Sequence, residues 1–296
     1  MSQRLDQAAI RARSWFPTAP PTAWSGHASP AVLTVNYNTT EALKLMLLTL
    51  SQQSAAKRIA RVVVIDQCSR DDPEGFLPQL AATCPRILLI TRRWRLHHAP
   101  GMRAGQRALA RSEQDQPAFP GANLLLYVDP DIAFLRPELL QQICLKFEDE
   151  DAAFLGQFRR NLFPRPEAQA SFLAVRRDWA ERRGISPWVH AGSPAWFQQR
   201  DLWAAGAKGV DFPVFRQAYA LHPGRTAVNR AARFRPWSSY ASEQEKAHFM
   251  GEPMAAEHLA ALRQRHAGLL GVSNGSALLE ALKSSPLGCV PLREHS

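Results

Sequence analysis

Long apolar runs, paired cysteines and lysines are all scarce in this 296-residue sequence. The longest apolar runs, such as Val62–Ile65 and Leu124–Val128, are far shorter than the roughly 20 residues that a membrane-spanning helix needs. The four cysteines lie far apart without a C-x-x-C pair, which argues against a zinc site or a disulfide framework. The first residues also lack the charged-then-apolar pattern of a signal peptide. We therefore expect a soluble cytoplasmic protein.

Lysine supplies only six of the 36 basic residues, so 30 are arginine and the net charge is +10. Arginine suits partners with planar, bidentate oxygens, such as phosphates and carboxylates. Nucleic acid, anionic lipid and sugar nucleotides all offer such groups. The sequence contains no nucleic-acid-binding module, so we expect no specific nucleic-acid partner.

From Ala31 onward, short apolar segments alternate with amphipathic stretches of helical length, which is typical of a parallel sheet with crossover helices. The strands that this pattern predicts are Ala31–Asn36, Arg61–Asp66, Arg86–Thr91 and Asn123–Val128. The predicted helices between them are one from Thr40, taken as the N-cap, one over Pro73–Leu80 and one over Gly101–Arg111.

The fourth predicted strand ends in Asp129-Pro130-Asp131. Open α/β sheets bind ligands in the crevice at the carboxyl ends of their strands, and the proline makes a turn there plausible. Converging aspartates bind a hard divalent cation such as Mg²⁺ or Mn²⁺, which in turn neutralises a diphosphate. A D-x-D string is short and common, and most isolated copies merely close a strand. Its place at the end of the fourth strand favours a metal site here.

Four blocks resemble, in order and spacing, the family 2 glycosyltransferases, whose fold is called GT-A. These blocks are Val35–Asn38, Val62–Asp72, Pro100–Gly105 and Leu126–Asp131. The resemblance implies an α/β fold, namely a Rossmann-like three-layer sandwich with a mostly parallel central sheet, plus a C-terminal helical extension. It divides the chain into a lead-in segment (1–29), a nucleotide-sugar-binding half (30–137), an acceptor-side half (138–240) and the helical extension (241–296).

The resemblance also implies site roles. Asp66 is expected to accept a hydrogen bond from the nucleotide base, although a turn cap is the plainer interpretation of this residue. Asp129 and Asp131 are expected to hold the ribose and the metal-bound diphosphate. His222, in a late His-Pro-Gly turn, resembles a histidine that touches the metal or diphosphate in some members, so the metal ligands would be Asp131, Asp129 and His222, with Mn²⁺ or Mg²⁺ bound. The full set of expected donor-binding residues is Val35, Asn36, Tyr37, Asp66, Gly101, Arg103, Asp129 and Asp131.

The catalytic base is harder to place. The family pattern continues with an acidic pair after a G-G-F-D segment, but this chain has no carboxylate over Phe215–Tyr219. An inverting transfer needs a base within hydrogen-bond reach of the acceptor hydroxyl. Asp211 is the first candidate from its position, and Asp201 and His190 are the alternatives. The adjacent His97 and His98 lack the i, i+4 spacing of helical metal ligands, so they are assigned no metal.

These features predict a metal-assisted, inverting glycosyltransferase that moves a sugar from a UDP-, GDP- or dTDP-sugar to a glycan or another hydroxyl acceptor, as in cell-surface polysaccharide synthesis. Two alternatives remain at this point: a GT-A-fold protein that binds sugar nucleotides without catalysis, and a sugar nucleotidyltransferase. Peripheral contact of the C-terminal helices with the inner face of the membrane also stays open.

Overall fold

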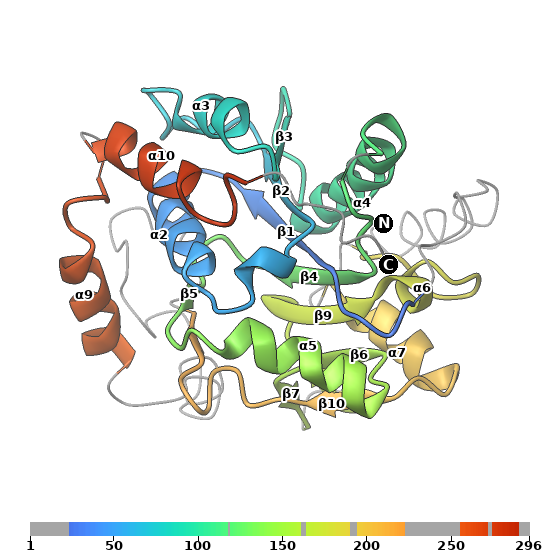
Figure 1. Ribbon diagram of the computed structural model, residues 1–296. Helices are drawn as coiled ribbons and strands as arrows, with labels where there is room; N and C mark the ends of the chain where they lie inside the picture. Colours follow the sequence, from blue (N-terminus) through green and yellow to red (C-terminus); the bar gives the residue numbers. More distant parts are fainter. Residues whose placement is uncertain are drawn as a thin grey trace.

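The computed structural model describes residues 24–117, 119–160, 164–189, 194–222, 255–271 and 274–289, which form a three-layer α/β/α sandwich (Figure 1). Its main sheet is 7-stranded, with the order β10-β6-β9-β4-β1-β2-β3, and two short ladders pair β5 with β11 and β7 with β8. The strands are β1 Pro30–Asn36, β2 Arg61–Asp66, β3 Ile87–Thr91, β4 Leu124–Val128, β5 Ala133–Phe134, β6 Phe154–Gly156, β7 Phe158–Arg159, β8 Glu167–Ala168, β9 Phe172–Arg176, β10 Gly209–Asp211 and β11 Ala220–Leu221.

The helices of the described residues cover both faces of this sheet. They are α2 Thr40–Ser51, the 3-10 turn η1 Ala56–Arg58, α3 Phe76–Thr83, α4 His98–Asp115, α5 Leu139–Glu150, α6 Arg177–Ala180, α7 Trp196–Ala204, α9 Ala255–Arg265 and α10 Gly275–Lys283. Strands β1 to β4 are mutually parallel, whereas β9 runs antiparallel to β4 and β6. The predicted α/β sandwich with a mostly parallel sheet is therefore confirmed.

Strand alternation divides the core into two apolar layers. Successive side chains of a strand point to opposite faces. In β2, Val62 and Val64 pack with residues of α2, α3, α5 and α10, whereas Val63 and Ile65 pack with residues of α4 and α7. Because β1, β2 and β4 are buried on both faces, their sequences are nearly continuous apolar runs.

Helix α4 approaches the sheet closely at two glycines. A Cβ atom on Gly101 would lie 2.9 Å from Val35 Cγ2 and 2.5 Å from Gln67 Nε2, and one on Gly105 would lie 2.7 Å from Ile65 Cδ1. These contacts are shorter than real Cβ atoms accept, so the two glycines fix the depth at which α4 sits over β1 and β2. This depth also sets the position of the helix start at His98, which is earlier than the predicted start at Gly101.

The loop after β2 caps two helices. The prediction that Thr40 caps α2 is wrong, because the helix begins at Thr40 and Thr39 is the N-cap residue, without a side-chain cap bond. The Asp71 carboxylate fills this role from outside, since it accepts hydrogen bonds from Thr40 N at 2.8 Å and Thr40 Oγ1 at 2.7 Å. Asp72 does the same for α3 by accepting from Phe76 N and Leu77 N. A carboxylate at a helix N-terminus is favourable because it satisfies free N–H groups and the helix dipole.

The C-terminal part returns to the first half of the fold. Helix α10 packs against α2 and α3, and α9 lies at the outer edge beyond α2 (Figure 1). Within the described ranges, we find no helix with the length and apolar character needed to cross a membrane.

Candidate active site

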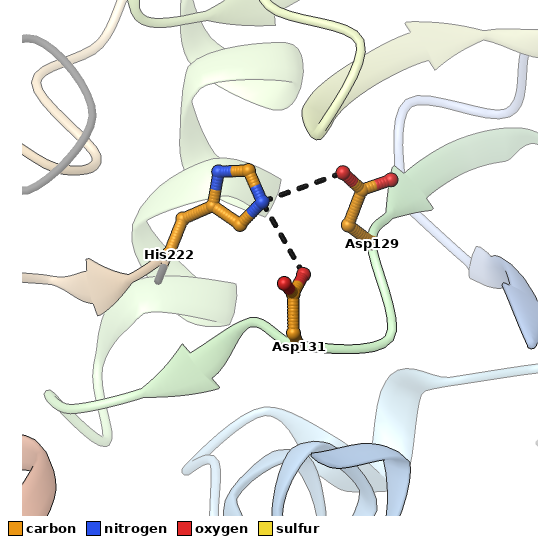
Figure 2. A group of neighbouring side chains, drawn as sticks. All are labelled: Asp129, Asp131 and His222. Carbon is orange, nitrogen blue, oxygen red and sulfur yellow. Dashed lines mark ion pairs between the residues drawn. The ribbon is translucent and has the colours of Figure 1, made fainter. Parts of the chain in front are cut away.

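Three predicted metal ligands meet at the carboxyl end of β4 (Figure 2). The strand ends in a turn closed by a hydrogen bond from Ile132 N to Asp129 O, so both aspartates point to one side. His222 Nε2 lies 3.2 Å from Asp131 Oδ1 and 3.4 Å from Asp129 Oδ2. Asp131 and His222 are 7% and 4% exposed, whereas the Asp129 side chain is 26% exposed, so the cluster is open to a ligand on the Asp129 side.

A short strand pair brings His222 to this place. Strand β5 follows the Asp-Pro-Asp turn directly and pairs with β11, with Ala133 opposite Leu221. His222 directly follows β11 and therefore lies beside the turn that precedes β5. The pairing of two residues on each strand thus brings His222 from late in the chain to the Asp129-Pro130-Asp131 turn.

The electrostatics of this cluster favour a cation. Burial alone would lower the pKa of His222, but the carboxylates of Asp131 and Asp129 outweigh burial and raise the pKa to about 10. At neutral pH the metal-free site therefore contains an imidazolium ion between two carboxylates. The donor atoms of the three side chains all lie within 4.8 Å of one another, as the ligands of a single divalent ion require.

His98 is a fourth side chain at this site, and the sequence analysis assigned it no role. Its Nε2 atom lies 3.7 Å from Asp129 Oδ1, on the opposite carboxylate oxygen from His222. Its ring also lies 5.5 Å from the ring of the buried Trp188. No spacing rule finds this contact, because it depends on where α4 begins and how deeply the helix sits over the sheet.

Asn36 and Asp66 form a second polar centre at the neighbouring strand ends. They are in register on β1 and β2, and Asn36 Nδ2 donates to Asp66 Oδ1 at 3.0 Å and to Ser69 Oγ at 3.1 Å. Asp66 Oδ2 also accepts from Ser69 N at 3.3 Å, so the carboxylate does close the turn after β2. Asp66 stays 7% exposed. The residue therefore makes the predicted turn contact while lying at the strand ends, where a ligand is expected.

The other predicted donor-binding residues surround these two centres. Tyr37 follows β1, and the Arg95 guanidinium lies 4.3 Å from its ring centroid. Val35 and Gly101 contact each other where α4 crosses β1. Arg103, further along α4, donates a hydrogen bond from Nη1 to the Trp188 carbonyl at 2.6 Å, which ties α4 to the segment after α6.

The base candidates lie elsewhere. Asp211 ends the edge strand β10, where it accepts from Phe158 N at 2.9 Å and forms ion pairs with Arg160 and Arg216. In the sheet, β10 is three strands from β4, which corresponds to about 14 Å at the usual strand spacing. Asp201 lies in α7, accepts from Ser186 N at 2.9 Å and pairs with Arg200. His190 lies outside the described residues.

Two solved structures resemble this fold over most of the chain. A mannosyltransferase, PcManGT from Pyrobaculum calidifontis in complex with GDP-Man and Mn²⁺, is 15% identical, with a TM-score of 0.51 over 100% of this chain and 95% of that one. S. aureus TarS 1-349 in complex with UDP-GlcNAc is also 15% identical, with a TM-score of 0.50 over 86% of this chain and 72% of that one. At such identities the likeness shows the fold, which is GT-A.

A family model adds a match at the level of sequence. No curated protein sequence matches the chain. The model described as glycosyl transferase family 2 matches residues 31–188, which are more than half of the 296 residues and include the strand ends that carry Asn36, Asp66, Asp129 and Asp131. The chain therefore belongs to glycosyl transferase family 2 and is a glycosyltransferase.

Proposed function

We propose that this glycosyltransferase uses a divalent metal ion to transfer a sugar from a nucleotide-diphosphate sugar to a hydroxyl acceptor, with inversion at the anomeric carbon. The observation that carries the proposal is the cluster of the partly exposed Asp129 with the buried Asp131 and His222 at the carboxyl end of β4. Family membership favours transfer over the nucleotidyltransferase and non-catalytic alternatives.

In this proposal the donor lies along the carboxyl ends of β1, β2 and β4. Asp66, held by Asn36, accepts a hydrogen bond from the nucleotide base, and Tyr37 and Val35 line the same strand end. Gly101 and Arg103 contribute the adjacent surface of α4. Such a site spans 30–137, the proposed donor half, while 138–240 forms the acceptor side and 241–296 the helical extension. Support comes from the alignment of these side chains on neighbouring strand ends, where open α/β sheets bind nucleotides.

The residues present fit Mn²⁺ better than Mg²⁺. Two carboxylate oxygens suit either ion, but imidazole is a poor ligand for Mg²⁺, which strongly prefers oxygen. When bound, a divalent ion neutralises the diphosphate as it leaves the sugar. The protein would supply His222 in its neutral form, and the carboxylates of Asp129 and Asp131 would hold the ion beside it.

Inversion requires one displacement, in which a base removes the acceptor proton as the acceptor oxygen attacks the anomeric carbon and the nucleoside diphosphate leaves. We propose Asp211 as this base, with Asp201 and His190 as the alternatives. The sugar and the acceptor hydroxyl would then occupy the rim between β4 and β10. Replacing Asp211 with Asn is expected to lower kcat by at least about 100-fold with little change in donor binding. A similar loss in Asp201→Asn alone would assign the base to that residue instead.

The neighbouring structures contain GDP-Man with Mn²⁺ and UDP-GlcNAc. These ligands support GDP- and UDP-sugars as donors to be tested for this chain, and dTDP-sugars complete the proposed panel. A glycan acceptor of cell-surface polysaccharide synthesis, handled in the cytoplasm, is the corresponding proposal for the second substrate.

The test is a comparison of matched carboxylate-to-amide variants. Donor binding is measured by calorimetry with Mn²⁺ for each nucleotide sugar, and donor turnover is measured by release of nucleoside diphosphate. Asp131→Asn is expected to abolish both, whereas Asp115→Asn, at the exposed end of α4, is expected to leave both unchanged. Failure of the unmodified protein to bind any donor with Mn²⁺ would overturn the proposal.

A further inference from the structure

Trp94 is the one large apolar side chain that is strongly exposed in the described part of the chain, at 68%. It lies in the connection between β3 and α4, at the carboxyl edge of the sheet. Arg92, Arg93 and Arg95 flank it in the sequence, and Arg107 and Arg111 of α4 extend the positive charge, because Arg107 interacts electrostatically with both Arg92 and Arg111. We define the arginine–tryptophan patch as Trp94 with Arg92, Arg93, Arg95, Arg107 and Arg111.

These arginines lack acidic partners. Within the described ranges, no carboxylate lies within 4.0 Å of any of the five guanidinium groups. Burial lowers the pKa of Arg107, and repulsion by Arg92 and by Arg111 lowers it further. Elsewhere in the fold, arginines such as Arg58, Arg159 and Arg177 are paired with glutamates. Among the described residues, nothing therefore compensates the positive charge of the patch.

We infer that this patch docks the enzyme on an anionic membrane surface. Tryptophan is favoured at the membrane–water interface, and clustered arginines are attracted by the negative potential of anionic lipids. A soluble polyanion without aromatic rings would account for the arginines but would leave the exposed indole in water, and the chain has no nucleic-acid-binding module. An anionic lipid surface offers negative charge to the arginines and an interfacial environment to the indole.

The position of the patch links docking to the site. Arg95 lies over the ring of Tyr37, and Tyr37 directly follows Asn36 on β1. Docking would therefore place the rim that carries Asn36 and Asp66 close to the membrane surface. Helices α9 and α10 were considered for this role from sequence. Helix α10 packs with α2 and α3 on the other side of the sheet from α4, and α9 packs with residues of α2, β5 and β11. The last turns of the two helices carry three Lys or Arg residues between them, against five arginines in the patch.

The test is co-sedimentation of the full chain with phosphatidylcholine vesicles that contain or lack phosphatidylglycerol. We expect binding to the anionic vesicles only, and less of it when the salt concentration is raised from about 0.1 M to about 1 M, where the Debye length falls to about 3 Å. Arg107→Gln with Arg111→Gln should weaken binding about 25-fold, at about fivefold for each arginine. Trp94→Ser should weaken vesicle binding severalfold. The fluorescence of Trp94, obtained as the difference in emission between the unmodified protein and Trp94→Phe, should shift to the blue on vesicle binding.

A charge-matched control separates this patch from the helical tail. Arg265→Gln with Lys283→Gln removes the same charge from exposed positions of α9 and α10 and is expected to leave binding unchanged. Loss of vesicle binding in this control variant, with binding unchanged in the patch variants, would overturn the inference. Equal binding to soluble dextran sulfate that does not depend on Trp94 would also overturn it, in favour of a polyanion site. None of these readouts depends on donor turnover, so failure here leaves the proposed function to its own test.

Discussion

Asn36 and Asp66 end two adjacent parallel strands in register, and the Asn36 amide donates to the Asp66 carboxylate at 3.0 Å. The same amide nitrogen also lies 3.2 Å from Thr40 Oγ1 and 3.1 Å from Ser69 Oγ, so a single buried side chain connects β1, α2 and the turn after β2. The orientation of Asp66 therefore depends on the amide of Asn36 at the end of the neighbouring strand.

The first prediction concerns this amide. Asn36→Ala leaves Asp66 Oδ1 without its donor and is expected to destabilise the protein by about 1 to 3 kcal/mol and to weaken donor binding. Thr34→Val is the control on the same strand, because Thr34 Oγ1 is buried without a hydrogen-bond partner and its removal should be neutral or stabilising. Urea unfolding and calorimetry measure the two effects. Equal stability of both variants would contradict the role given to Asn36.

The second prediction concerns the pH dependence of the metal-free protein. Because the folded-state pKa of His222 is raised from 6.5 to about 10, its contribution to stability is fully present below about pH 6.5 and is lost as the pH rises towards 10. The difference in unfolding free energy between the unmodified protein and His222→Asn should therefore shrink across this range. A difference that does not change from pH 6 to pH 10 would show that His222 is not held as an imidazolium.

The third prediction is that metal binding releases a proton. The imidazolium must lose its proton to become a ligand, so Mn²⁺ binding at pH 7 to 8 should release about one proton per ion. Calorimetry in buffers of different ionisation enthalpy counts this proton. His222→Asn should bind Mn²⁺ more weakly and release none, and proton release that survives this substitution would place the proton on another group.

The fourth prediction concerns His98, which contacts the Asp129 oxygen that faces away from His222. Groups that orient a metal-binding carboxylate commonly change metal affinity about 10-fold or more when removed. His98→Ala is therefore expected to weaken Mn²⁺ binding about 10-fold at unchanged stoichiometry. His27→Ala, at a side chain that is 90% exposed and far along the chain from this site, should have no effect.

The fifth prediction tests the depth of α4. Gly101→Ala adds a methyl group beside Val35 and should cost about 1 to 3 kcal/mol in overpacking, against about 1 kcal/mol gained in helix propensity. We expect a net loss of stability and, because the helix start moves, weaker Mn²⁺ binding. Gly268→Ala meets open space and should stay within about 0.5 kcal/mol of the parent protein. Thermal unfolding compares the two.

The sequence predicts the sheet well because its strands are buried on both faces and are therefore continuous apolar runs, as in Val62–Ile65. The aspartates that follow such strands could be named for the same reason, since strand ends meet at one rim. The capping of α2 could not be predicted, because Asp71 reaches Thr40 across a loop, whereas the N-cap preference of threonine favoured Thr40 itself. His98 was missed because its contact with Asp129 is a tertiary one.

The pairing of β5 with β11 has a kinetic consequence. It closes a loop of roughly 90 residues to bring His222 beside Asp131, and such closure costs entropy before its contacts are gained. We expect the carboxylates to be placed with the donor half of the sheet and His222 to join them only when β11 pairs with β5. Acquisition of tight Mn²⁺ affinity during refolding should thus be among the last events, and a metal-sensitive signal would report completion of the whole fold.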